Sequence, residues 1–188
     1  LGIREIIKGN PDLILSGING GANLGTDIHY SGTVAAAREG ALMNIPSYAF
    51  SLVDMSSPGH VGARTPMRYE MAAQIARKVV DQTVNLKFPK HTLVNVNIPN
   101  IDLKEIKGAR VARQGFRYYT HEVTKRKDPR GRDYYWVGGP YMGFEKSPQS
   151  DCHAVDERCV SVTPITIDCT HESFLRTLEG ASIESLTF

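Results

Sequence analysis

A polar, glycine-rich segment, Ser16–Val34, separates two apolar stretches near the start of the chain. Before it, Asp12–Ser16 reads DLILS, a short apolar run typical of a strand buried on both faces. After it, an alanine-rich stretch predicts a helix that ends near Asn44, and Ile45–Leu52 predicts a second buried strand. The order of strand, loop, helix and strand is typical of a βαβ unit, which predicts an α/β fold.

Residues 65–107 predict one more helix and one more strand of this core. Thr65, followed by Pro66, predicts the N-cap and first residue of a helix that runs to about Val84. Thr92–Asn100 alternates apolar and polar residues, which is typical of a strand nearer a sheet edge. We therefore assign residues 1–107 to the α/β core of a single domain.

Residues 108–188 form the second part of the same domain. Two stretches rich in β-branched, aromatic and basic residues, 109–123 and 132–139, flank the turn signal Asp128–Gly131 and predict a projecting β-hairpin. Asp156–Ile167 predicts a last core strand, and Thr170 is the predicted cap of a short final helix. Basic and aromatic side chains in a hairpin suit either a neighbouring subunit or a nucleic acid, and we favour the subunit.

Composition narrows the classes of protein that the chain can represent. Its 188 residues carry a net charge of only +2, which gives no electrostatic argument for binding nucleic acid or a membrane. No apolar run approaches the ~20 residues of a membrane-spanning helix. The three cysteines match no metal-ligand spacing and are typical of a reducing compartment, so we expect a cytoplasmic protein.

The glycine-rich segment is also the best candidate for a binding site, because ligands of open α/β sheets bind where strands run into helices. Ser31, Gly32 and Thr33 at the expected helix start suit an anion, with phosphate as the best candidate. Asn19 and Asn23 could offer amide oxygens to a hard cation or amide N–H groups to phosphate. The structural alternative is that Ser31 only caps the helix and the asparagines only make turns.

The sequence is short of acidic metal ligands around this segment. Asp27, Glu39 and Asp54 are the nearest carboxylates, and a structural role is the better interpretation of each. The histidines have no zinc-ligand spacing, and no G-x-S-x-G motif indicates a hydrolase triad.

The residues of the segment also carry a family resemblance. PDLILSGINGGANLGTDIHYSGTVAAAREGALMNIP, residues 11–46, resembles the signature of the SurE family of metal-dependent nucleoside monophosphate phosphatases. The later stretches VNVNIPN, DPRGRDYYWVGG and AVDERCVSVTPITID resemble a strand, the projecting hairpin and the last core strand of that family. The resemblance thus covers nearly the whole chain.

The resemblance implies a Rossmann-like, mainly parallel sheet with flanking helices, and hydrolysis of nucleoside 5′- or 3′-monophosphates with Mg²⁺ or Mn²⁺. By the family's motif, Asn19 is a metal ligand, whereas Asn23, Ser31, Gly32 and Thr33 line the phosphate site. The resemblance also implies a homodimer or homotetramer formed through C-terminal elements.

The chain departs from the family in one respect. The family begins with a strand that ends in an N-D-D-G motif, whose aspartates bind the metal, and this motif does not occur here. Ile3, Ile6 and Ile7 have helical spacing, which reads as the tail of an interior helix, so we expect the acidic catalytic residues upstream of Leu1. Two alternatives stay open: an inactive structural or oligomerising fragment and, ranked last, a nucleic-acid-binding module.

Overall fold

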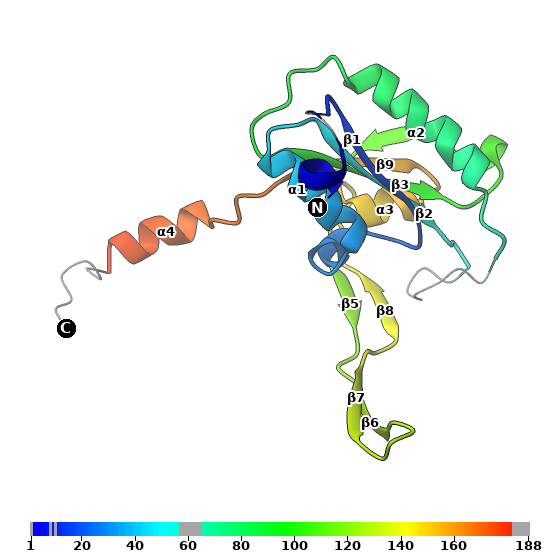
Figure 1. The fold of residues 1–188 in the computed structure, drawn as a ribbon, viewed down its shortest axis with the longest axis vertical. Helices are drawn as coiled ribbons and strands as arrows, with labels where there is room; N and C mark the ends of the chain where they lie inside the picture. The colour runs from blue at the N-terminus through cyan, green and yellow to red at the C-terminus, as the bar shows by residue number, and fades with distance from the viewer. Residues whose placement is uncertain (1, 8, 10, 57–64, 182–188) are drawn as a thin grey trace.

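The computed structural model describes residues 2–7, 9, 11–56 and 65–181. Its main sheet has five strands in the order β1-β2-β3-β9-β4 (Figure 1). The strands are β1 (Ile14–Gly20), β2 (Ser47–Val53), β3 (Thr92–Pro99), β9 (Val160–Thr166) and β4 (Ala109–Val111). The pairs β1–β2, β2–β3 and β4–β9 are parallel, and β9 is antiparallel to β3. The predicted α/β fold with a mainly parallel sheet is confirmed.

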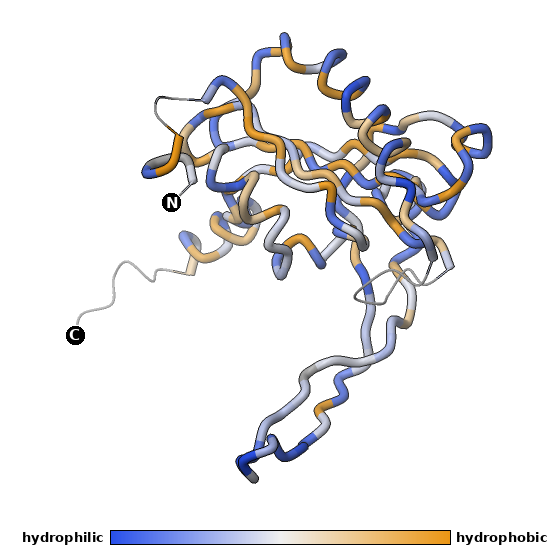
Figure 2. The backbone as a smooth tube through the Cα atoms, turned by 45° about the vertical axis from the view of Figure 1, so that its right-hand side comes forward, coloured by the Kyte–Doolittle hydropathy of each residue, from blue (hydrophilic) through white to orange (hydrophobic). Residues whose placement is uncertain are grey.

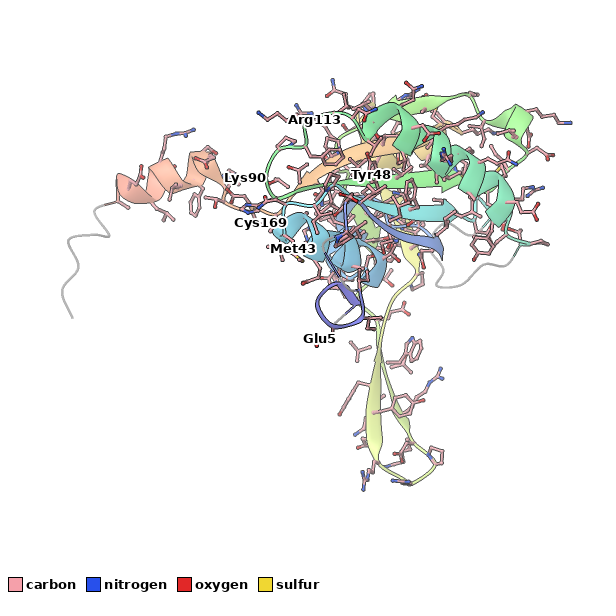
Figure 3. The ribbon with its side chains drawn as sticks, turned by 45° about the horizontal axis from the view of Figure 1, so that its top comes forward. Glu5, Met43, Tyr48, Lys90, Arg113 and Cys169 are labelled. Atoms are coloured by element: carbon pink, nitrogen blue, oxygen red, sulfur yellow. The ribbon has the colours of Figure 1, made fainter. Side chains whose placement is uncertain are left out.

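Helices cover both faces of this sheet (Figure 1). Along β2, alternate side chains face opposite ways, as the period of a strand requires. Tyr48, Phe50 and Leu52 pack with the buried side of α2 (Tyr69–Thr83), and Figure 3 shows Tyr48 in this layer. Ala49 packs instead with α1 (Gly32–Leu42), and Val53 packs with α3 (Asp151–Asp156), a helix that the sequence pattern did not predict.

Two strands have places in the sheet that differ from the prediction. β1, expected to be buried on both faces, is the edge strand of the described sheet, and Leu15 is 55% exposed. β3, expected near an edge, is the central strand and is buried from Val96 to Pro99 on both faces. The alternation of β3 misled the prediction because its polar residues Asn95 and Asn97 are buried under the glycine-rich segment.

Two helices begin later than predicted. α2 begins at Tyr69 after Arg68, because Asn100 accepts a hydrogen bond from the Arg68 N–H at 3.1 Å and Thr65 donates its N–H to Asp54. The final helix, α4 (Glu172–Glu179), is capped by His171 instead of Thr170. At the start of the chain, the predicted helix is a single turn, Gly2–Ile6, and short 3₁₀ turns follow at Gly25–His29 and Leu103–Glu105.

A narrow arm of two successive antiparallel pairs projects from the sheet (Figure 1). Its base pairs β5 (Arg117–Tyr119) with β8 (Tyr141–Phe144), and its outer part pairs β6 (Val123–Lys127) with β7 (Asp133–Val137). The predicted turn is confirmed, since the Gly131 N–H donates to the Asp128 carbonyl at 2.9 Å. The stretch Ala109–Val111, predicted as part of the hairpin, belongs to the main sheet as β4. Figure 2 shows that the tip of the arm is hydrophilic.

A substitution in α1 tests how closely this helix packs on the sheet. A Cβ added at Gly40 would overlap with Ser47 Oγ and Ile14 Cδ1, so we expect Gly40→Ala to lower the free energy of unfolding by about 2 kcal/mol. A Cβ added at Gly32, at the start of the same helix, would meet nothing within 4 Å. Gly32→Ala should therefore change stability by less than about 0.5 kcal/mol. Urea unfolding of both variants checks the contrast, and equal midpoints would contradict the packing.

Candidate functional site

The candidate site lies at the carboxyl ends of β1 and β2, where the glycine-rich segment leaves the sheet and runs to α1 (Figure 1). β1 extends through Gly20, so Asn19 belongs to the strand and not to the loop. The strand register places Asn19 beside Ser51, Ser51 beside Asn97, and Asn97 beside Ser161. A row of polar side chains therefore crosses four strands of the sheet at this level.

Asn23 is the point at which the segment is fixed to this polar row. Its backbone N–H donates to Asn97 Oδ1 at 2.9 Å, and its carbonyl accepts from the Nδ2 groups of Asn97 at 2.9 Å and Asn95 at 2.8 Å. Its side chain donates to Ser51 Oγ at 2.7 Å and is buried. The structure thus places Asn23 inside the fold, with its Nδ2 already engaged.

Asn19 and the start of α1 lie on the more accessible side of the segment. Asn19 donates Nδ2 to the Gly21 carbonyl at 3.0 Å, a bond that does not use its side-chain oxygen. Ser31 is the N-cap of α1 and accepts from the Val34 N–H at 3.1 Å. The capping role left open by the sequence is therefore present, and the Ser31 hydroxyl can still donate its proton elsewhere. Gly32 and Thr33 form the first turn of α1, whose N–H groups have no partner within the helix.

Asp151, which the sequence did not point to, fixes the next part of the segment. This fully buried carboxylate accepts from the Gly25 and Gly115 N–H groups at 2.9 Å and from the Cys152 N–H at 2.7 Å. Burial raises the pKa of the Asp151 carboxyl, and the backbone donors act in the opposite direction. Gly25 has a φ of 53° and lies so close to Gly115 that a Cβ would come within 3.0 Å of its backbone. Glycine is therefore required where the segment crosses the base of the arm.

Asp27 joins the segment to the arm through a buried charge. Its carboxylate pairs with the guanidinium of Arg117 and accepts from the Tyr119 hydroxyl at 2.9 Å. The guanidinium also lies over the Tyr141 ring, 4.2 Å from its centroid. Burial raises the pKa of the Tyr119 hydroxyl far above its usual value, so it stays a hydrogen-bond donor. Asp27 therefore has the structural role that we predicted.

The other candidate carboxylates do not complete a metal site. Asp54 is buried at the end of β2 and accepts from the Ser56 N–H and hydroxyl, whereas Glu39 is exposed on α1. Within residues 2–7, 9, 11–56 and 65–181, no three His, Cys, Asp or Glu side chains are grouped so as to hold a metal ion. Asn19 alone offers one neutral oxygen, which is too little to bind a divalent cation. The described residues therefore do not fit Mg²⁺ or Mn²⁺ by themselves.

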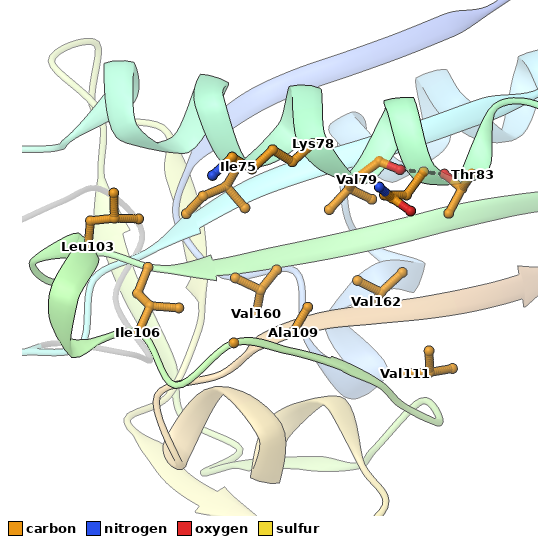
Figure 4. Close-up of a pocket in the computed structure, with 12 residues that line it drawn as sticks. Ile75, Lys78, Val79, Thr83, Leu103, Ile106, Ala109, Val111, Val160 and Val162 are labelled. Atoms are coloured by element: carbon orange, nitrogen blue, oxygen red, sulfur yellow. Dashed lines mark hydrogen bonds between the residues drawn. The ribbon is translucent and has the colours of Figure 1, made fainter.

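An apolar groove lies elsewhere in the fold. A groove of about 440 Å³ runs between α2 and the strands β4 and β9, on the face of the sheet opposite α1 (Figure 4). Its walls are formed by aliphatic side chains such as Ile75, Val79 and Val160. The groove is separated by the sheet from α1, so it is not part of the candidate site.

The fold and this site define a Rossmann-like α/β protein with a polar, glycine-rich segment held at the carboxyl ends of parallel strands. The model of the family "Survival protein SurE" matches residues 1–121. The chain therefore belongs to the SurE family.

Proteins named 5′-nucleotidase SurE are similar to this chain. The protein of Pelobacter propionicus is 42% identical over 178 residues, which are 95% of this chain and 69% of that protein. That of Symbiobacterium thermophilum is 44% identical over 170 residues, which are 90% of this chain and 63% of that protein. The crystal structure of the SurE protein from Aquifex aeolicus matches with a TM-score of 0.74 at 40% identity, over 96% of this chain and 69% of that chain. The chain thus spans between 63% and 69% of the length of these relatives.

The three hydrogen bonds of Asp151 can be tested by their effect on stability. Asp151→Ala leaves the Gly25, Gly115 and Cys152 N–H groups without their acceptor, and we expect the free energy of unfolding to fall by about 3 kcal/mol. Asp156→Ala, an exposed acid at the end of the same helix, should change it by less than about 0.5 kcal/mol. Chemical denaturation measures both, and an Asp151→Ala variant as stable as the parent would refute the assigned role.

Proposed function

We propose that the complete protein is a phosphatase that hydrolyses nucleoside 5′- or 3′-monophosphates to nucleoside and phosphate with a divalent cation, Mg²⁺ or Mn²⁺. The relatives named 5′-nucleotidase support this substrate class. The observation that carries the proposal is the start of α1, where the Ser31 hydroxyl and the N–H groups of Gly32 and Thr33 are available to an anion.

In this proposal, the start of α1 holds the phosphoryl group. A Cβ at Gly32 would meet nothing within 4 Å, so an anion can come close to the backbone there. The Ser31 and Thr33 hydroxyls and the first N–H groups would donate to phosphoryl oxygens, whose charge changes as the ester bond breaks. Asn23 would line the site on the side of the sheet. Because its Nδ2 donates to Ser51 Oγ, Asn23 would also fix the segment in place. The catalysis that these residues supply is positioning and electrostatic stabilisation.

Asn19 is the proposed metal ligand of this chain. It would offer its side-chain oxygen together with carboxylates that the described residues do not supply. The cation, when bound, supplies a Lewis acid and an activated water. The same shortage of carboxylates favours the alternative that these 188 residues alone are inactive. Phosphate release from AMP by the complete protein but not by the 188-residue chain would support both statements, and turnover by neither would contradict the proposed function.

The proposed role of Thr33 gives a specific expectation for the complete enzyme. Thr33→Val keeps the shape of the side chain and removes one donor to the phosphoryl group, so kcat/KM for a nucleoside monophosphate should fall about tenfold, equivalent to ~1.5 kcal/mol. Thr92→Val removes a hydroxyl at the start of β3, at the end of the sheet away from the candidate site, and should leave kcat/KM within about twofold of the parent value. Equal kinetics of the two variants would remove Thr33 from the site.

We also propose that the protein is a homodimer or homotetramer formed through its C-terminal elements. α4 extends away from the sheet (Figure 1), and Phe174, Leu175 and Leu178 are 55%, 42% and 38% exposed. Exposed apolar side chains on one helix are typical of a protein–protein interface.

The three cysteines are free thiols, which supports the cytoplasmic location that we propose. No helix in the described ranges is both long and apolar enough to cross a membrane.

A charge placed on the apolar side of α4 should disrupt this assembly. We expect Leu175→Glu to shift the protein from the oligomer to the monomer in size-exclusion chromatography with light scattering, because burying the new charge is costly. Thr177→Glu, an exposed polar position of the same helix, should leave the oligomer intact. A parent protein that is already monomeric would contradict the proposal.

Nucleic acid binding by the arm ranks below this interpretation. Two of its cations, Lys125 and Lys127, are already paired with Asp133 at 2.8 and 2.9 Å.

A further inference from the structure

One of the two buried faces of the central strand β3 carries two amide side chains at positions where apolar side chains would pack more readily. Asn95 and Asn97 are both fully buried, and they lie on the face of the sheet that α1 and α3 cover. Val96 and Ile98 lie on the other face, which packs against α2. Burying an amide is unfavourable unless its polar atoms find partners. The partner that both amides share is the backbone of Asn23.

The contact between Asn97 and Asn23 copies the pattern of a sheet. Asn97 Oδ1 accepts from the Asn23 N–H and Asn97 Nδ2 donates to the Asn23 carbonyl, both at 2.9 Å, so one side chain holds both polar groups of one residue. Asn95 adds a second donor to the same carbonyl at 2.8 Å. We call these three hydrogen bonds the amide clamp.

The amide clamp acts where the segment has little apolar side-chain surface to hold it. The residues before Asn23 are Gly20, Gly21 and Ala22, which offer almost no side-chain surface for packing. Gly21 has a φ of 152° and so adopts backbone that favours glycine. Without a fixed point, such a segment would sample many conformations, and ordering it would cost conformational entropy. The clamp supplies that fixed point from the central strand of the sheet.

We infer that Asn95 and Asn97 are positioning residues of the site: they hold Asn23, and through it the course of the chain between Asn19 and Ser31. This inference rests on the proposed function, because the ends of that stretch are the proposed metal and phosphate residues. Neither asparagine of β3 touches the substrate in this role. Their effect on ligand binding passes through the backbone of the segment.

The residue that follows β3 offers a matched control. Asn100, also buried, holds a different segment in the same way: its Oδ1 accepts from the Arg68 N–H and its Nδ2 donates to the Pro66 carbonyl, both at 3.1 Å. Asn97→Asp and Asn100→Asp therefore make the same chemical change, each removing the donor half of a contact with a main-chain N–H and carbonyl. They differ in which segment is released.

The experiment compares amide hydrogen exchange and AMP binding in the presence of Mg²⁺ for the complete protein and for both variants made in it. We expect Asn97→Asp to speed exchange at least tenfold within residues 21–31 and to weaken AMP binding at least tenfold. Asn100→Asp should speed exchange near residues 65–69 and weaken AMP binding less than threefold. A general loss of stability would instead raise exchange alike in both variants, which would overturn the inference.

Asn95→Ser keeps the experiment decisive if Asn97→Asp does not fold, because it removes only the bond from Asn95 Nδ2 to the Asn23 carbonyl. It should speed exchange in the same residues, by a smaller factor, and weaken AMP binding about threefold. Unchanged exchange in residues 21–31 would overturn the clamp, and faster exchange with unchanged AMP affinity would overturn its role in binding. A complete protein that binds no AMP would count against the proposed function, whereas the exchange data decide on the clamp in either case.

Discussion

The hydrogen bonds between Asn23 and the amides of β3 set the position on which the site depends. The chain leaves β1 at Gly20 and enters α1 at Gly32. Between these residues it runs along the carboxyl ends of the strands. It does so through fixed contacts taken in order: Asn23 with the central strand, Gly25 with Asp151, and Asp27 with Arg117. Each contact joins the segment to a different element.

All three contacts use polar groups, and the composition of the segment explains why. Glycine and small residues bury little apolar area, and each buried CH₂ contributes only about 0.8 kcal/mol to stability. Directional bonds to backbone groups can fix such a chain in one conformation, which apolar packing alone would not specify. Leu24 and Ile28 are the buried apolar side chains that the segment does contribute, and they pack under α3 and α1. Polar contacts therefore determine the path of the segment, and apolar contacts pack it against the helices.

The sequence predicted the main elements because their local patterns are strong. The run before the glycines, the alanine-rich helix and the apolar strand Ser47–Val53 form the predicted βαβ unit. The cap at Ser31 and the turn at Asp128 were also found from local chemistry. The position of β3 was not, because alternation is the same whether the polar face meets solvent or a buried backbone. Asp151 gave no signal at all, since its three partners lie in two other segments and in its own helix. Long-range contacts of this kind cannot be derived from spacing.

The buried ion pair at the base of the arm has a mechanical consequence. Arg117 is 2% exposed at its side chain, and its partner Asp27 lies in the turn between the glycines and α1. Breaking this pair would leave a charge in a low-dielectric surrounding, so bending at the base is costly. We therefore expect the base of the arm to be rigid relative to the sheet. We also expect a force on the outer strands to act on the turn that contains Asp27, which lies only a few residues before the helix that begins at Gly32.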